Sequence, residues 1–334
     1  MSSTNLAVPL VLGLLLVMAQ QSMQKNLKNP IAEIQTSNCK IAFLRLGLVF
    51  TSDVNEKVLR DSGLYEPDSE NPYVDIAGRR FHMGSLNNTP IIYVKSGSSS
   101  VNVAAAVQIL FDRFRVYGIS FFGNAGSLDE ETLAPGDVSV PEAVAFTGIW
   151  EWKKFPSEDK LEDGKLVFRK FNYPQNGENL LGSVEFRKVK LFSQGEPPKD
   201  VFFLPISERW YSAATEALKD LELRKCYFDV CLLNTPKVVF GSRGSTSDMY
   251  IKNKAYGDFL RDTFKVSSAD TSSASLALTS LSNNKKLFVV FQGVSNVVGG
   301  KSSDSKLSYI ASYNAFLAAT KFINSIPTPR VACE

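Results

Sequence analysis

Side chains that could act as nucleophiles or general bases are few in this chain. It contains a single histidine, His82, and four cysteines, at positions 39, 226, 231 and 333. A serine or cysteine nucleophile usually needs a histidine base, and zinc sites usually combine cysteine with histidine. His82 has no partner visible in the sequence, and no histidine lies near any cysteine. We therefore expect no metal, no cofactor and no hydrolytic triad, and we interpret His82 as structural.

Two cysteines are close enough in sequence for a local disulfide. Cys226 and Cys231 are five residues apart, which is too wide for the CxxC motif of thiol oxidoreductases. An even cysteine count is compatible with disulfides in a secreted chain. We predict a Cys226–Cys231 bridge. The alternative is that all four thiols are reduced and partly buried.

A run of serines could bind an anion. Ser98, Ser99 and Ser100 come directly before a predicted helix. The apolar face of that helix consists of Val103, Val107, Leu110, Phe111 and Phe114. The free N–H groups and the dipole at a helix start favour an anion, so Ser98 and Ser99 are candidate phosphate-binding residues. An ordinary N-cap explains the same serines equally well.

Strand and helix patterns alternate in the first half of the chain. We expect a buried strand over 41–50, a short helix capped by Asp53, and strands over 81–86 and 90–95. A helix follows Ser100, and then a strand over 116–122 that breaks at the glycine-rich residues 123–126. A further strand begins near Gly136. Strand, glycine-rich turn, helix and strand together indicate an α/β fold with a parallel or mixed sheet.

The second half begins with a long polar stretch. Residues 150–199 are rich in Lys, Glu, Pro and Gly without a sustained period, which indicates a surface excursion rather than a second core. The expected elements beyond it are helices over 207–223, 253–264, 271–281 and 303–324, and strands over 237–241 and 287–294. The sequence therefore predicts a single domain over residues 40–328 with a loop insertion at about 150–199.

Several separated segments carry recognisable motifs. They are Gly123-Asn124-Ala125-Gly126-Ser127 with Pro135-Gly136-Asp137-Val138, then Ser247-Asp248-Met249-Tyr250-Ile251, then ADTSSASLA over 269–277, and Gly293-Val294-Ser295-Asn296. In this order they resemble the GxAG…GDV, SGDAFI, VDMESAAVA and xxSD blocks of nucleoside phosphorylases and methylthioadenosine nucleosidases. Residues 144–152 and 299–300 are similar to the plant branch of this family, which contains storage proteins of bark and vegetative tissue.

The resemblance implies both a fold and a site. The fold would be a three-layer α/β/α sandwich around a mixed, barrel-like central sheet, and the chain would assemble as a homo-oligomer. The site would take a purine nucleoside or base, and in some members phosphate, and would cleave the N-glycosidic bond. Ala125, Gly126, Tyr250 and Thr271 would bind the substrate. Tyr250 would stack on the base, although an aromatic residue there could equally belong to the core.

The same resemblance shows that two carboxylates are replaced. Cleavage requires a proton or strong hydrogen bond for the leaving purine, a grip on the ribose hydroxyls, and a positioned nucleophile. Asn296 stands for the Asp of SD and cannot deliver a proton. Ser272 stands for the Glu of DMES and is too short to grip two hydroxyls. Hydrolytic members place a Glu soon after the first strand. Asp53 is the nearest candidate here, but we favour an N-cap role for it.

The N-terminal segment and the net charge indicate the compartment of the protein and limit its expected partners. Residues 6–19 are apolar and uncharged and are followed by a Gln-rich stretch, which is the pattern of a signal peptide. We predict a signal peptide over 1–19, an extension over 20–39 and a vacuolar or extracellular destination; a retained anchor is the alternative. The net charge is +3, and Lys and Arg are scattered. We therefore expect no nucleic-acid partner, and no membrane partner after cleavage.

Three functions remain open at this point. The replaced carboxylates and the signal peptide favour a storage protein whose purine site is weak or inactive. An active purine nucleosidase or phosphorylase of altered specificity is the second interpretation. A nucleoside- or adenine-binding protein without turnover is the third.

Overall fold

The computed structural model describes residues 41–153, 165–167, 183–284, 286–300 and 305–332. The predicted signal peptide and extension, Cys39 and Cys333 lie outside these ranges. The described residues between 43 and 330 form one compact unit, and residues 41–42 with 331–332 belong to a second, smaller one. At the boundary, β1 (Ile41–Phe43) pairs with β22 (Arg330–Ala332).

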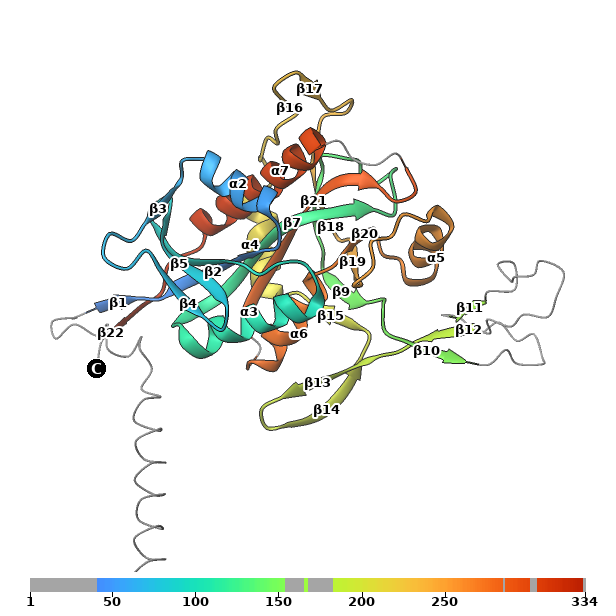
Figure 1. Cartoon of the computed structure of the whole chain (residues 1–334), viewed down its shortest axis with the longest axis horizontal. Helices are drawn as coiled ribbons and strands as arrows, with labels where there is room; N and C mark the ends of the chain where they lie inside the picture. The colour runs from blue at the N-terminus through green and yellow to red at the C-terminus, as the bar shows by residue number, and fades with distance from the viewer. Residues whose placement is uncertain (1–40, 154–164, 168–182, 285, 301–304, 333–334) are drawn as a thin grey trace, which may run out of the picture. The chain divides into compact units, whose positions relative to one another are not determined.

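The larger unit is built on a mixed sheet of thirteen strands (Figure 1). These are β2 (Arg45–Phe50), β3 (Tyr65–Pro67), β4 (Tyr73–Ile76), β5 (Arg79–Leu86), β6 (Thr89–Lys95), β7 (Val116–Ser127), β8 (Val138–Val140), β9 (Ala143–Phe146), β15 (Phe203–Pro205), β18 (Val238–Phe240), β19 (Arg243–Thr246), β20 (Ser268–Asp270) and β21 (Leu287–Val297). The main path runs β15-β9-β19-β20-β7-β2-β6-β5-β3. β7 pairs in parallel with β2 and β21 and antiparallel with β20, which confirms the predicted mixed sheet.

Helices cover both faces of this sheet. They are α2 (Asp53–Asp61), α3 (Ser100–Arg113), α4 (Glu208–Ala217), α5 (Lys254–Phe264), α6 (Ser273–Ser282) and α7 (Ser305–Ser325). α3 packs with α6, while α2 and α4 pack with α7, and Figure 1 shows α2 and α7 across the sheet from α3 and α6. Strands covered on both faces are rich in apolar residues, as residues 287–291 of β21 are. No helix in the described ranges is long and apolar enough to cross a membrane.

Strand β7 is longer than predicted. The break expected at residues 123–126 is wrong, because β21 pairs with β7 through that segment, from Gln292 opposite Gly123 to Val297 opposite Ser127. The glycine-rich stretch is therefore part of a ladder rather than a turn. The partner strand also makes a close approach elsewhere, since a Cβ added to Gly293 would lie 1.9 Å from the carbonyl oxygen of Ala311 in α7. Both strands thus carry their motif residues side by side.

Two helix ends also differ from prediction. The N-cap of α2 is Ser52 rather than Asp53: Ser52 is extended, and its hydroxyl accepts a hydrogen bond from the backbone N–H of Asn55. Asp53 is the first helical residue. α4 ends at Ala217, before the expected limit near Leu223, because Leu218 leaves helical geometry with φ −102° and ψ 4°.

The polar stretch after residue 150 contains more structure than predicted. β10 (Trp150–Lys153), β11 (Lys165–Val167) and β12 (Ser183–Phe186) form a small sheet, and β13 (Val189–Ser193) pairs with β14 (Glu196–Val201). Trp150 and Phe186 make edge contacts with each other and pack against α5. A satellite cluster lies there, around Leu128, Leu260, Val266 and Val298. The composition of this stretch, which is rich in Lys and Glu, did not predict that its aromatic residues would pack against the domain.

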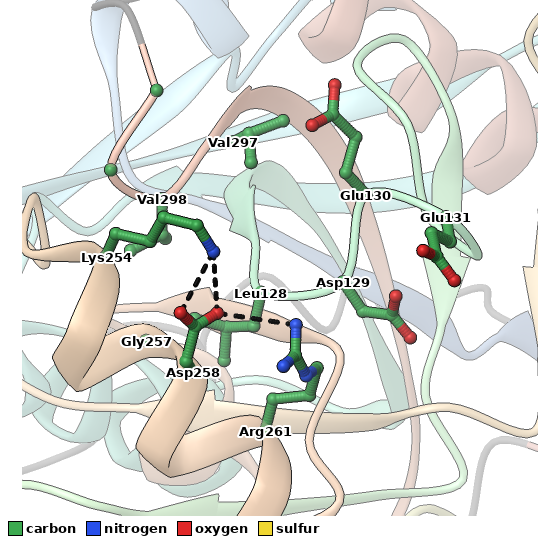
Figure 2. A pocket seen from close by; sticks show the side chains of 12 residues that line it. Leu128, Asp129, Glu130, Glu131, Lys254, Gly257, Asp258, Arg261, Val297 and Val298 are labelled. Carbon is green, nitrogen blue, oxygen red and sulfur yellow. Dashed lines mark hydrogen bonds and ion pairs between the residues drawn. The ribbon is translucent and has the colours of Figure 1, made fainter.

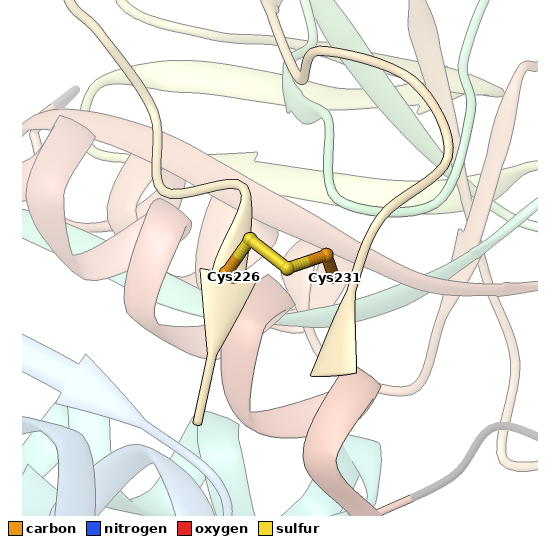
Figure 3. The surroundings of a disulfide bond; sticks show 2 residues. All are labelled: Cys226 and Cys231. Carbon is orange, nitrogen blue, oxygen red and sulfur yellow. A yellow bond between two sulfur atoms is a disulfide. The ribbon is translucent and has the colours of Figure 1, made fainter. Parts of the chain in front are cut away.

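The predicted disulfide is present in the structure. Cys226 and Cys231 lie directly opposite each other in the hairpin of β16 (Cys226–Tyr227) and β17 (Val230–Cys231), and their sulfurs are bonded (Figure 3). Beside them, Tyr227 stacks on Tyr309 of α7 with ring centroids 4.0 Å apart. Lys306 of the same helix donates to Asp229 at the hairpin tip. The hairpin is therefore fastened to the first turns of α7.

Candidate functional site

A cavity of about 350 Å³ opens where the ends of β7, β20 and β21 meet the starts of α2 and α3. Its lining comes from segments that are far apart in the sequence. These residues are Thr51, Ser52, Val54, Ser98, Asn124, Ala125, Gly126, Met249, Tyr250, Ile251, Lys252, Ala269, Asp270, Thr271, Ser295, Asn296, Val298 and Ser308. Its volume is at the lower end of the range for small-molecule sites.

The structure brings most of the predicted site residues together here. Ser98, Ala125, Gly126, Tyr250, Thr271 and Asn296 all line the cavity. Two predicted residues do not. Ser272 is only 2% exposed at the start of α6, and Ser99 lies just outside the lining with a positive φ of 88°. Tyr250 is 75% exposed, so it belongs to the cavity rim and not to the core.

Asn296 presents an amide where a proton donor would be required. It is half-buried at a point where the β21–β7 register shifts. Its Oδ1 accepts a hydrogen bond from the Ser295 hydroxyl (3.0 Å), and its Nδ2 donates to the carbonyl of Val297 (3.3 Å). An amide has further hydrogen-bonding capacity, so Asn296 can contact a ring nitrogen, but it has no proton to transfer.

Ser272 is too short and too deep to hold a sugar. It is the N-cap residue of α6 but makes no side-chain cap bond, and its hydroxyl lies 3.3 Å from that of Thr271. Thr271, by contrast, faces the cavity. The position that the sequence resemblance assigned to a carboxylate is therefore occupied by hydroxyl groups.

Asp270 is the only carboxylate among the described residues that line the cavity, and sequence reasoning missed it. Its Oδ1 accepts hydrogen bonds from the Thr246 hydroxyl (2.7 Å) and the Ser272 N–H (3.1 Å). The Ser273 N–H also reaches it at 3.2 Å, and its Oδ2 accepts from Gln292 Nε2 (2.9 Å). An Asp just before Thr-Ser-Ser and a helix is a capping pattern that the sequence did contain. These bonds commit the carboxylate to structure.

Two hydrogen-bonded amides were also missed: Asn124, which lines the cavity, and Asn55, which does not. Asn55 of α2 is fully buried, and its Nδ2 donates to Asn124 Oδ1 (3.2 Å) and to the Ser312 hydroxyl (2.7 Å). Asn124 Nδ2 in turn donates to the carbonyl of Ser308 (2.9 Å). The network joins α2, β7 and α7 without a carboxylate. Nothing in the spacing of these residues signals their proximity, because they lie 69 and 257 positions apart.

Asp53 does not supply the missing acid. Its side chain is 94% exposed and forms an ion pair with Lys95 (2.8 Å), whose ammonium also contacts Glu56. The pKa of Asp53 is lowered by this contact with Lys95. These groups line a separate groove of about 790 Å³. Asp53 is therefore neither the N-cap nor a base for the cavity.

A third groove, of about 700 Å³, lies beside α5 (Figure 2). Lys254 and Arg261 both reach the carboxylate of Asp258, at 2.9 and 3.4 Å. Asp129, Glu130 and Glu131, from the segment after β7, line the same groove. This groove is larger than the cavity, yet none of the predicted site residues lines it. We regard the smaller cavity as the functional site because the motifs meet there.

The packing of His82, which we interpret as structural, leads to a prediction about pH. Its ring stacks on Tyr93, with centroids 4.4 Å apart, and burial lowers the pKa of the imidazole. The unfolded chain, with a His pKa near 6.5, then binds more protons than the folded one in the window below that value. Stability should be complete above about pH 6.5 and should fall as the pH drops towards the lowered folded pKa.

Comparing wild type with His82→Gln isolates this contribution from that of the carboxylates. We expect wild type to lose more stability than the variant between pH 7.5 and 5.5 in urea titrations. Equal losses in the two proteins would contradict the prediction.

A family model described as the phosphorylase superfamily matches residues 46–322. The chain belongs to this superfamily. It is 70% identical over 317 residues to bark storage protein A of Populus deltoides, covering 95% of this chain and all of the relative.

Solved structures support the same fold. A methylthioadenosine/S-adenosylhomocysteine nucleosidase of Colwellia psychrerythraea in complex with adenine superposes with a TM-score of 0.59 at 18% identity, covering 85% of this chain and 96% of that one. The corresponding Streptococcus pneumoniae nucleosidase, in complex with 8-aminoadenine, gives 0.58 at 14% identity, covering 85% of this chain and all of that one. At such identities the likeness concerns the fold.

Proposed function

We propose that this chain is a storage protein of the secretory pathway, built on a phosphorylase-superfamily fold whose purine site no longer turns over. The observation that carries the proposal is the hydrogen bonding of the Asp270 carboxylate. It is the sole carboxylate among the described lining residues, and it is committed to Thr246, Gln292 and the α6 N-terminus. Asn296 and Ser272 supply no acid in its place. The 70% identity to a bark storage protein supports the storage role.

Storage predicts a processed protein that accumulates and is later consumed. We expect material purified from native tissue to begin near Gln20, because residues 6–19 have the length and apolarity of a signal-peptide core. We also expect its share of soluble protein to rise before dormancy or growth arrest and to fall on regrowth. N-terminal sequencing and quantitative mass spectrometry over one growth cycle test both points. Recovery of residues 1–19, or a constant low abundance, would remove the support for storage.

A second function, base binding without turnover, is favoured by the cavity itself. The cavity has a volume of about 350 Å³, and Tyr250 lies at its rim. The Asn296 amide can still form a hydrogen bond with a ring nitrogen. Related folds are described in complex with adenine and with 8-aminoadenine. We expect adenine to bind in calorimetric titrations and Tyr250→Ala to weaken that binding. Phe228→Ala is the matched control, since Phe228 is a similarly exposed aromatic residue on the disulfide hairpin. The absence of heat at millimolar adenine would rule out this function.

A further inference from the structure

The N-terminus of α3 already holds an anion that belongs to the chain. The backbone N–H of Ser100 donates to Oδ1 of Asp248 at 2.7 Å, across 148 residues of sequence. Ser99, the N-cap residue, makes no side-chain cap bond, and the first turn of α3 contains no acidic residue. The free N–H groups at a helix start attract negative charge. Asp248 supplies that charge from a distant loop.

The same bond joins two walls of the cavity. One wall contains Ser98, two residues before the Ser100 amide, and the other contains Met249, Tyr250, Ile251 and Lys252 directly after Asp248. The loop that forms the second wall is fixed at its start, where the Ser247 N–H donates to the carbonyl of Asp270 (3.0 Å). At its far end Asn253 caps α5. Within the loop, Asp248 makes the one side-chain hydrogen bond to the opposite wall found among the described residues.

We infer that Asp248 acts as a built-in anion that occupies the amide site at the start of α3, shuts inorganic phosphate out of the cavity, and positions the Tyr250 loop. The part that concerns base binding rests on the function proposed above, and the part that concerns phosphate does not. A phosphate placed at the same N–H groups would adjoin the Asp248 carboxylate, and like charges at such distances repel. Phosphate can enter only when this carboxylate leaves.

With Asp248 in place, the serine run is not required to complement the start of α3. Ser98 and Ser99 precede a helix start whose charge is already complemented, so neither hydroxyl is required as a cap. The loop also gains order from the bond. The Tyr250 side chain is 75% exposed, whereas the next residue, Ile251, packs against the satellite cluster, so the Asp248 bond restrains the loop on the side of Tyr250 that faces α3. Asp248 is thus a positioning residue for the rim of the cavity.

The experiment uses the mature protein and two variants. Asp248→Asn keeps an oxygen acceptor but loses the charge, and Asp248→Ala loses both. Asp262→Asn, at an exposed acid outside the cavity lining, is the control for net charge. Each protein is titrated with inorganic phosphate, and with sodium chloride at equal ionic strength, while thermal unfolding and the amide resonance of Ser100 are followed. Adenine binding is measured calorimetrically in parallel.

We expect saturable stabilisation by phosphate, and a matching shift of the Ser100 amide resonance, in the Ala variant and more weakly in the Asn variant. Wild type and Asp262→Asn should respond to phosphate as they do to chloride. Adenine affinity should fall about two- to fivefold in Asp248→Ala, which corresponds to the loss of one exposed charge interaction at a helix start.

Saturable phosphate binding by wild type, or no phosphate response in either Asp248 variant, would overturn the anion role. Unchanged adenine affinity in Asp248→Ala would overturn the positioning role. If wild type binds no adenine at all, the proposed base-binding function fails, while the phosphate titration still decides the anion role.

Discussion

Incubated with methylthioadenosine, adenosine or inosine, with or without phosphate, the mature protein is expected to release free base very slowly or not at all. Two losses act together. Asn296 cannot protonate the leaving purine, and general acid catalysis contributes about 10²–10⁴-fold. Ser272 cannot grip the ribose as charge develops on the sugar. If each loss costs about 3–5 kcal/mol, turnover falls by at least about three to four powers of ten even with partial non-additivity.

The structure adds a reason why no neighbouring group compensates. The lining contains the amide of Asn124, which is hydrogen-bonded to Asn55, and Asp53 is bound to Lys95 in another groove. Asp270 has its oxygens occupied by Thr246, Gln292 and the α6 N–H groups. A general base for water is therefore absent from the described lining.

Chromatographic quantification of free base tests this prediction, and turnover near one per second on any of these nucleosides would refute the storage proposal.

Restoring the two carboxylates by substitution gives a second test. The side chain at position 296 lines the cavity, so the Asp of Asn296→Asp would face it. Position 272 is buried at the start of a helix, so the Glu of Ser272→Glu would have to extend past Thr271. We expect activity to rise in the double variant Asn296→Asp/Ser272→Glu and less in Asn296→Asp alone. Asn71→Asp, at an exposed loop residue, is the matched control. No gain in the double variant would mean that the pocket itself, rather than these two positions, is inactive.

Much of the cavity could be predicted because motif residues follow strands. The segments ending β7, β20 and β21 meet at one edge of the sheet, so Ala125, Thr271 and Asn296 come together whatever their sequence separation. The helical spacing of apolar residues in α3 and the apolar runs of β2 and β21 likewise predicted a sheet covered by helices.

What escaped prediction depends on pairing between distant segments. The glycines at 123 and 126 look like a turn until β21 pairs with them. Ser52 is the cap of α2 because its backbone is extended, whereas Asp53 is already helical. Sequence patterns at helix ends do not distinguish positions one residue apart. The contacts of Asn55 with Ser312 and of Asp248 with Ser100 join side chains or amides from different layers. Local periodicity contains no information about them.

Replacing Asp270 by Ala is expected to destabilise the fold by about 3–5 kcal/mol, because charged hydrogen bonds contribute about 1.5–3 kcal/mol each and N-caps about 1 kcal/mol, with incomplete additivity. The change leaves the Thr246 hydroxyl, the Gln292 amide and two N–H groups of α6 without their acceptor. The Gln292 amide cannot easily turn to compensate, since its Oε1 accepts from the Ser268 hydroxyl at 2.7 Å.

Asp270→Asn should be intermediate, because one amide oxygen still accepts from Thr246 and the α6 N–H groups while its NH₂ faces the Gln292 NH₂. Urea unfolding followed by circular dichroism measures both variants, and Asp262→Ala, at an exposed acid, is the control. A loss below about 1 kcal/mol in Asp270→Ala, within the range of ordinary surface substitutions, would show that the carboxylate is not held by the fold. Asp270 would then be free for chemistry, and the central support for an inactive site would be lost.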